Sequence, residues 1–156
     1  MCASPVRPLL DDLRDRPELV VHVLHRLLGW ELEQPVRALL ADPNETRVHA
    51  RGREWRADLA FELRRLGGRS SWLAVVAPDL RDDYERAYLW PCHAALLGVR
   101  RGGPAGLLAL VPHEEDVVWA TQTVSYGFGA LTFTPLAITG AALVTLRATL
   151  AAEQRG

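Results

Sequence analysis

The feature that most constrains the fold is an unbroken apolar run at residues 72–77, which is followed by a proline. Consecutive apolar residues without polar alternation are typical of a strand that is buried on both faces of a sheet. Pro78 cannot donate a ladder hydrogen bond, so we expect the strand to end there. A second apolar run at residues 106–111 predicts another buried strand. Two such strands with a helical segment between them indicate an α/β fold.

Periodicity places the remaining elements around these two strands. Helical spacing predicts helices at residues 17–29, 35–41, 82–99, 113–121 and 140–153, and Pro91 predicts a kink or a shortened start in the third of them. Alternation predicts strands at 46–50, 54–63 and 131–138, with a hairpin turn at 51–53 and a break at Pro135. We therefore expect a mixed sheet flanked by helices on both faces, in one domain at residues 17–156, preceded by an N-terminal segment at residues 1–16.

Charge limits the chemistry that the chain can perform. The formal net charge is −1, which provides no global attraction to nucleic acid, so any such contact needs a local basic patch. All 18 basic residues are arginines. The absence of lysine excludes Schiff-base chemistry, a phosphate-binding lysine of the Walker type and a lysine general base.

The cysteines and the apolar segments indicate the compartment. Cys2 and Cys92 stand in no metal-ligand spacing, and we interpret both as free thiols of a reducing, cytoplasmic environment. Residues 1–12 lack the basic and apolar regions of a signal peptide. No apolar stretch reaches the length of about 18 residues that a membrane-spanning helix needs. We therefore expect no transmembrane helix and no membrane partner.

Two carboxylates stand out as candidate site residues. Asp58 falls in the middle of the strand at 54–63, where aspartate is disfavoured. Either it points to solvent or pairs with Arg56 or Arg64, or it is a metal-binding or catalytic carboxylate on the face of the sheet. Asp79 follows the central strand at its carboxyl end, a common site position in α/β proteins. The alternative for Asp79 is an acid in the loop that precedes a helix.

Several short motifs together resemble a known family. The chain resembles the bacterial recombination-promoting nuclease / putative transposase family, within the PD-(D/E)XK nuclease superfamily, over residues 17–138. The resemblance is carried by Arg56-Ala57-Asp58-Leu59, the strands at 73–76 and 107–112, Leu80-Arg81, Tyr88 and Trp90-Pro91. It implies a restriction-endonuclease-like fold.

The resemblance also implies an incomplete active site. In the superfamily an Asp and a Glu-x-Lys or Glu-x-Gln bind Mg²⁺ and orient a water molecule. Asp58 matches the Asp, whereas the Glu position falls on Ala77 and the Lys or Gln position on Asp79. A methyl group cannot ligate a cation. Either the site is inactive, without a cofactor, and the fold serves binding or assembly, or Asp79 replaces the Glu and forms a Mg²⁺ pair with Asp58, assisted by Glu18 or Glu62.

Two further regions are candidates for partners. Residues 45–71 hold seven arginines against four acids, and either they form a solvated hairpin or they contact DNA. The nucleic-acid candidates are Arg53, Arg56, Arg64 and Arg81. The apolar C-terminal helix at residues 141–150 is the candidate surface for a protein partner or a second copy of the chain.

Overall fold

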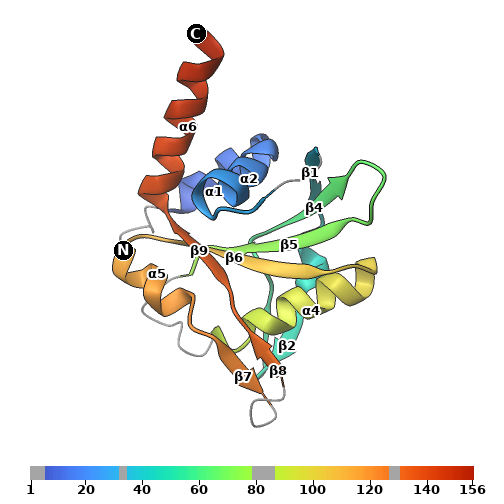
Figure 1. Ribbon diagram of the computed structural model, residues 1–156. Helices are drawn as coiled ribbons and strands as arrows, with labels where there is room; N and C mark the ends of the chain where they lie inside the picture. Colours follow the sequence, from blue (N-terminus) through green and yellow to red (C-terminus); the bar gives the residue numbers. More distant parts are fainter. Residues whose placement is uncertain (1–5, 32–34, 79–86, 127–130) are drawn as a thin grey trace.

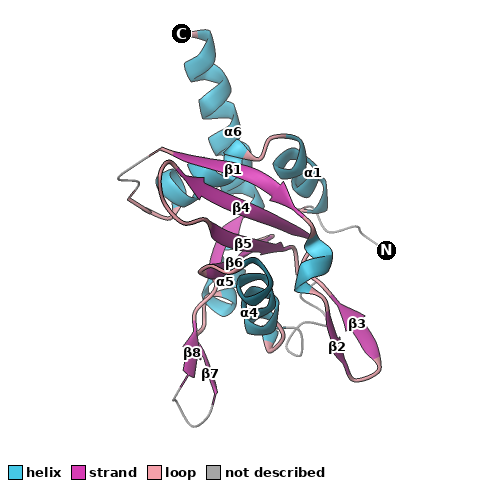
Figure 2. Ribbon diagram, turned by 90° about the vertical axis from the view of Figure 1, so that its right-hand side faces the viewer, coloured by secondary structure: helices cyan, strands magenta, loops and turns pink. Residues whose placement is uncertain are grey.

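The computed structural model describes residues 6–31, 35–78, 87–126 and 131–156, and these build a mixed sheet between two helical layers (Figures 1 and 2). The five strands lie in the order β1-β4-β5-β6-β9. Their bounds are β1 Val36–Ala41, β4 Leu59–Arg65, β5 Ser71–Val76, β6 Ala105–Val111 and β9 Leu136–Thr139. The pairs β1–β4 and β4–β5 are antiparallel, and β5–β6 and β6–β9 are parallel. The predicted mixed α/β architecture is thus confirmed.

The two apolar runs occupy the centre of this sheet, as predicted. In β5 every residue from Trp72 to Val76 is buried, and in β6 so is every residue from Leu107 to Val111. β5 ends at Val76, before Pro78. Parallel pairing, with Val75 opposite Leu108, places these strands where both of their faces are covered.

Helices cover both faces of the sheet. One face carries α1 (Arg7–Asp15), α2 (Glu18–His22), the π-helix η1 (Val23–Leu27) and α6 (Gly140–Arg155). The other carries α4 (Trp90–Arg101) and α5 (Glu114–Ala120) (Figure 1). The first core contains Leu13, Val20, Phe61, Leu108 and Leu143, all completely buried. α1 therefore packs into the same core as α2 and α6.

Two small hairpins lie outside the main sheet (Figure 2). β2 (Val48–Ala50) pairs with β3 (Arg53–Trp55), after the 3₁₀ helix η2 (Pro43–Thr46). Arg51 and Gly52 join these strands with φ values of 52° and 72°. Both values lie in the left-handed region that a type I′ turn requires. The hairpin turn predicted at 51–53 is thus confirmed, although Arg53 already belongs to β3. β7 (Val124–Tyr126) pairs with β8 (Leu131–Phe133), and β7 was not predicted.

Three sequence predictions are wrong in their element assignments. Residues 36–41 of the predicted helix form the strand β1, because they pair with residues 60–65 of β4. The strand predicted at 54–63 is divided into β3 and β4, which are separated by residues 56–58. Thr46 belongs to η2, so β2 begins only at Val48. The predicted break at Pro135 is confirmed, because β8 ends at Phe133 and β9 begins at Leu136.

The start of the long helix predicted at 82–99 lies outside the described residues. Its described part is α4, which begins at Trp90 with Pro91 in its first turn, a position where proline is tolerated. Cys92 is a free and exposed thiol, and Cys2 lies outside the described residues. Within the described ranges, no helix is long and apolar enough to cross a lipid bilayer.

Candidate functional site

Asp58 lies at the edge of the sheet where the parallel strands end. β5, β6 and β9 run in one direction, so their carboxyl ends share an edge, and β4, which is antiparallel to β5, begins there. Asp58 immediately precedes β4, and its backbone N–H donates to Val75 O over 2.9 Å. The edge is the usual location of sites in open α/β sheets.

The Asp58 carboxylate is bound to the backbone of Ala77. Its Oδ2 accepts the Ala77 N–H at 2.8 Å, and Ala77 is 6% exposed. The last ladder pair of β4 and β5 is Leu59 opposite Val75. Beyond that pair, the Asp58 carboxylate takes the place of a backbone carbonyl as the acceptor for Ala77, and it holds the ends of the two strands together. A hydrogen bond to an ionised carboxylate is stronger than one between neutral groups.

The arginines proposed as partners of Asp58 bind elsewhere. Arg56 Nη1 donates to Asn44 Oδ1 at 2.6 Å, and Arg64 pairs with Glu62. The alternative in which Asp58 pairs with Arg56 or Arg64 is therefore wrong, and the half-buried Asp58 side chain accepts a backbone hydrogen bond instead.

Next to Asp58, Thr46 and His93 form a second set of hydrogen bonds, the closure behind Asp58, which fixes the chain before β4 and which the sequence analysis did not identify. Thr46 is completely buried, its Oγ1 donates to Pro43 O at 2.6 Å, and the same oxygen accepts the Ala57 N–H at 2.8 Å. The Thr46 carbonyl accepts a 2.7 Å hydrogen bond from Nδ1 of His93 on α4. Burial lowers the pKa of His93, although the bond to Thr46 and the charge of Asp58 oppose that shift. In the sequence, Thr46 before a short strand and His93 on the inner face of a helix were the signals that could have indicated these hydrogen bonds.

The two acids proposed as assistants do not reach Asp58. Glu62 stands four residues further along the strand, a separation of about 13 Å at the usual rise per residue. Its hydrogen bonds with Arg64 and Ser70 lower its pKa. Glu18 lies on α2, which covers the opposite face of the sheet from α4, whose His93 interacts with the Asp58 charge. The proposed assistance by Glu62 is therefore wrong, and Glu18 belongs to the helical layer on the other face of the sheet from His93.

The described residues do not fit Mg²⁺ at this position. A hard divalent cation requires several oxygen ligands in near-octahedral geometry. Asp58 provides one carboxylate, one oxygen of which already accepts a hydrogen bond, and the Ala77 side chain provides no ligand. The described chain holds no group of three or more histidine, cysteine, aspartate and glutamate side chains suited to a metal ion. Asp79 and Arg81 lie outside the described residues.

The candidate nucleic-acid arginines that the structure describes do not form one patch. Arg53 is exposed on β3, whereas Arg64 lies near the far end of β4. Neighbouring arginines bind acids of the same region: Arg47 pairs with Glu54 at 2.8 Å, and Arg101 pairs with Glu45. These pairs neutralise much of the local positive charge and favour the interpretation of a solvated hairpin.

The C-terminal helix α6 uses most of its large apolar side chains within the chain. Leu143 and Leu146 are buried, and Leu150 packs partly buried against the same core. Arg147 pairs with Asp12 of α1, and Glu153 accepts two hydrogen bonds from Arg26 of η1 at 2.8 and 2.9 Å. Val144 remains 44% exposed. The apolar surface that α6 leaves open is thus smaller than its sequence suggests.

Comparisons with known proteins give no further assignment. No family model, no curated protein and no solved structure matches this chain.

Proposed function

We propose that this protein is a catalytically inactive PD-(D/E)XK-like module that serves binding or assembly. The observation that carries the proposal is the hydrogen bond from the Ala77 N–H to the Asp58 carboxylate. It uses the acid that matches the superfamily's Asp as a structural acceptor, beside a methyl group at the position of the superfamily's Glu. A restriction-endonuclease-like fold is part of the proposal, and the mixed sheet with helices on both faces supports it.

The partner proposed for this module is a second copy of the chain or another protein, bound through α6 in the cytoplasm. The support is the exposed Val144 on a helix whose inner side is already held by the core. A direct test is sedimentation of the pure protein over a range of concentrations. We expect an oligomer that Val144→Glu converts to monomer, whereas Val118→Glu on α5, at another exposed valine, leaves it intact. A monomer at every concentration contradicts self-assembly.

The alternative function is a Mg²⁺-dependent DNA nuclease that hydrolyses phosphodiesters with Asp58 and Asp79. The position of Asp58 at the carboxyl edge of the parallel strands favours this alternative, since Asp79 follows β5 at the same edge in the sequence. The described residues alone do not complete such a metal site, so the alternative depends on Asp79.

Metal titration distinguishes the two functions. Calorimetric titration of Mn²⁺ into the wild-type protein and into Asp58→Asn measures whether Asp58 is a ligand. Our proposal predicts no saturable binding that depends on Asp58. Stoichiometric Mn²⁺ binding that is lost in Asp58→Asn, in a variant that remains folded, contradicts the inactive module and supports the nuclease.

A further inference from the structure

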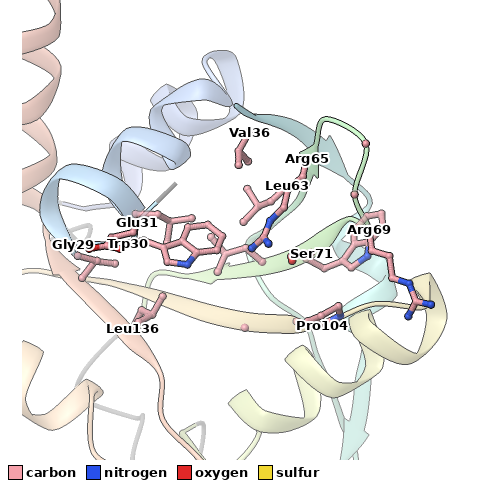
Figure 3. Close-up of a pocket in the computed structure, with 18 residues that line it drawn as sticks. Gly29, Trp30, Glu31, Val36, Leu63, Arg65, Arg69, Ser71, Pro104 and Leu136 are labelled. Carbon is pink, nitrogen blue, oxygen red and sulfur yellow. The ribbon is translucent and has the colours of Figure 1, made fainter. Parts of the chain in front are cut away.

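A cavity of about 1020 Å³ opens at the other end of the sheet from Asp58 (Figure 3). It lies where β5, β6 and β9 begin, and its lining includes Ser71, Ala105 and Leu136 from these strands. Its size is at the upper end of the range for small-molecule sites. The apolar part of the lining comes from both the helical layer and the sheet: Leu24, Leu28, Val36, Leu63, Leu73 and Leu136.

Trp30 forms a fixed wall of this cavity. Gly29 adopts a φ of 70°, which turns the chain out of η1 and directs it back across the sheet. The Trp30 N–H then donates to Leu24 O at 2.8 Å, and the Trp30 carbonyl accepts a hydrogen bond from His25 Nδ1 at 3.0 Å. Both backbone groups of Trp30 are therefore occupied, so the wall is preformed and a ligand need not order it.

Arg65 supplies a positive charge beside this wall. Its guanidinium carbon lies 5.6 Å from the centroid of the Trp30 ring (Figure 3). Among the described residues no carboxylate forms an ion pair with Arg65, although its neighbour Arg64 is paired with Glu62. A guanidinium that stacks on an aromatic ring retains in-plane N–H groups, and their fork matches a carboxylate.

Two further charged residues, Arg69 and Glu31, line the cavity in addition to Arg65. Glu31 is exposed and also lines the cavity, next to Trp30 in the chain. The two arginines and Glu31 give the lining a net charge of +1, which suits a ligand with one negative charge better than a ligand with several. An apolar body with one carboxylate satisfies the leucine-rich lining and Arg65 together.

We propose that this cavity binds an apolar carboxylic acid of the fatty-acid class. The hydrocarbon chain lies against the leucines, and the carboxylate accepts hydrogen bonds from Arg65. This inference does not depend on the function proposed above, because the cavity contains neither Asp58 nor Ala77 and lies at the opposite edge of the sheet.

Gly106 offers a way to obstruct part of the cavity at a position where the backbone has room for a side chain. A Cβ added there meets only Leu73 Cδ1, at 3.9 Å, which is an ordinary contact. Gly106 lies on β6, lines the cavity and does not require positive φ. A larger residue is therefore tolerated by the strand, and Gly106→Leu projects its side chain into the space that the ligand needs.

Calorimetric titration with decanoate below its micelle concentration tests the proposal. We expect saturable binding at one site. Arg65→Ala weakens it about 10-fold or more, as expected for loss of a charge-assisted hydrogen bond. Arg64→Ala, the matched control on the same strand, leaves the affinity unchanged. Gly106→Leu weakens binding while the circular dichroism spectrum stays native.

Several results would overturn the proposal. These are the absence of saturable binding, equal weakening by Arg64→Ala and Arg65→Ala, or full binding by a folded Gly106→Leu variant. Equal affinity for 1-decanol also overturns it, because the cavity would then suit any apolar group, such as a side chain of a protein partner. If Gly106→Leu does not fold, the comparison of the two arginine variants decides.

Discussion

Replacement of Asp58 separates a structural carboxylate from a metal ligand. In Asp58→Ala the Ala77 N–H, whose residue is 6% exposed, loses its acceptor at 2.8 Å and has little access to water. Loss of a hydrogen bond to a charged group costs about 1.5–3 kcal/mol. For a chain of this length, a loss of about 2 kcal/mol lowers Tm by about 4–8 °C. Asp58→Asn retains a side-chain carbonyl that can accept the same bond, so we expect less than about half of that loss.

Urea and thermal unfolding of the wild-type protein, Asp58→Ala and Asp58→Asn measure this difference without any metal. The expected order of stability is wild type, then Asn, then Ala. Equal destabilisation by both variants would refute a role as hydrogen-bond acceptor. An Asp58→Ala variant that is more stable than the wild type would refute this role as well. Such a gain in stability indicates that Asp58 destabilises the fold and is retained for function.

Two further predictions concern the closure behind Asp58. Since burial lowers the pKa of His93 in the folded state, the unfolded chain takes up the proton first, so stability is complete above about pH 6.5 and falls below it. The decline is at most about 1.4 kcal/mol per pH unit for one such group. Urea unfolding of His93→Asn, whose amide can still donate to Thr46 O, should show a shallower decline, and an equally steep one contradicts this assignment. Thr46→Val removes both hydrogen bonds of a completely buried hydroxyl. It should cost about 2 kcal/mol in thermal unfolding. The control Thr149→Val lies at an exposed position on α6. Its effect should stay within about 0.5 kcal/mol, and similar losses in both variants contradict the role given to Thr46.

Buried and strongly patterned elements could be predicted from the sequence. The apolar runs that became β5 and β6 and the Arg51-Gly52 turn depend on local chemistry alone. β1 could not be predicted, because its adjacent Leu39 and Leu40 also suit a helix, and only pairing with β4 makes the segment a strand. The strand predicted at 54–63 is broken at residues 56–58, where the Ala57 N–H donates to the Thr46 side chain and the Asp58 side chain accepts from Ala77, and periodicity does not reveal such contacts.

The candidate sites also depend on contacts between residues that are distant in the sequence. Asp58 could be selected from the sequence because aspartate is unusual in a strand, but its role depends on its approach to Ala77, nineteen residues later. The cavity could not be predicted, since its lining comes from η1 and from the ends of five strands that are distant in the sequence. The available signals were Gly29 before Trp30, and Gly106 in an otherwise bulky strand.

The most direct test of the inactive-module proposal is cleavage of mixed-sequence DNA by the pure protein in Mg²⁺ and in Mn²⁺, beside Asp58→Asn. Asp58→Asn is the informative variant because it removes a charged ligand and retains the hydrogen bond to Ala77. Our account predicts no cleavage above background by either protein. Metal-dependent cleavage by the wild-type protein that disappears in a folded Asp58→Asn variant would contradict it and would establish Asp58 as a catalytic carboxylate.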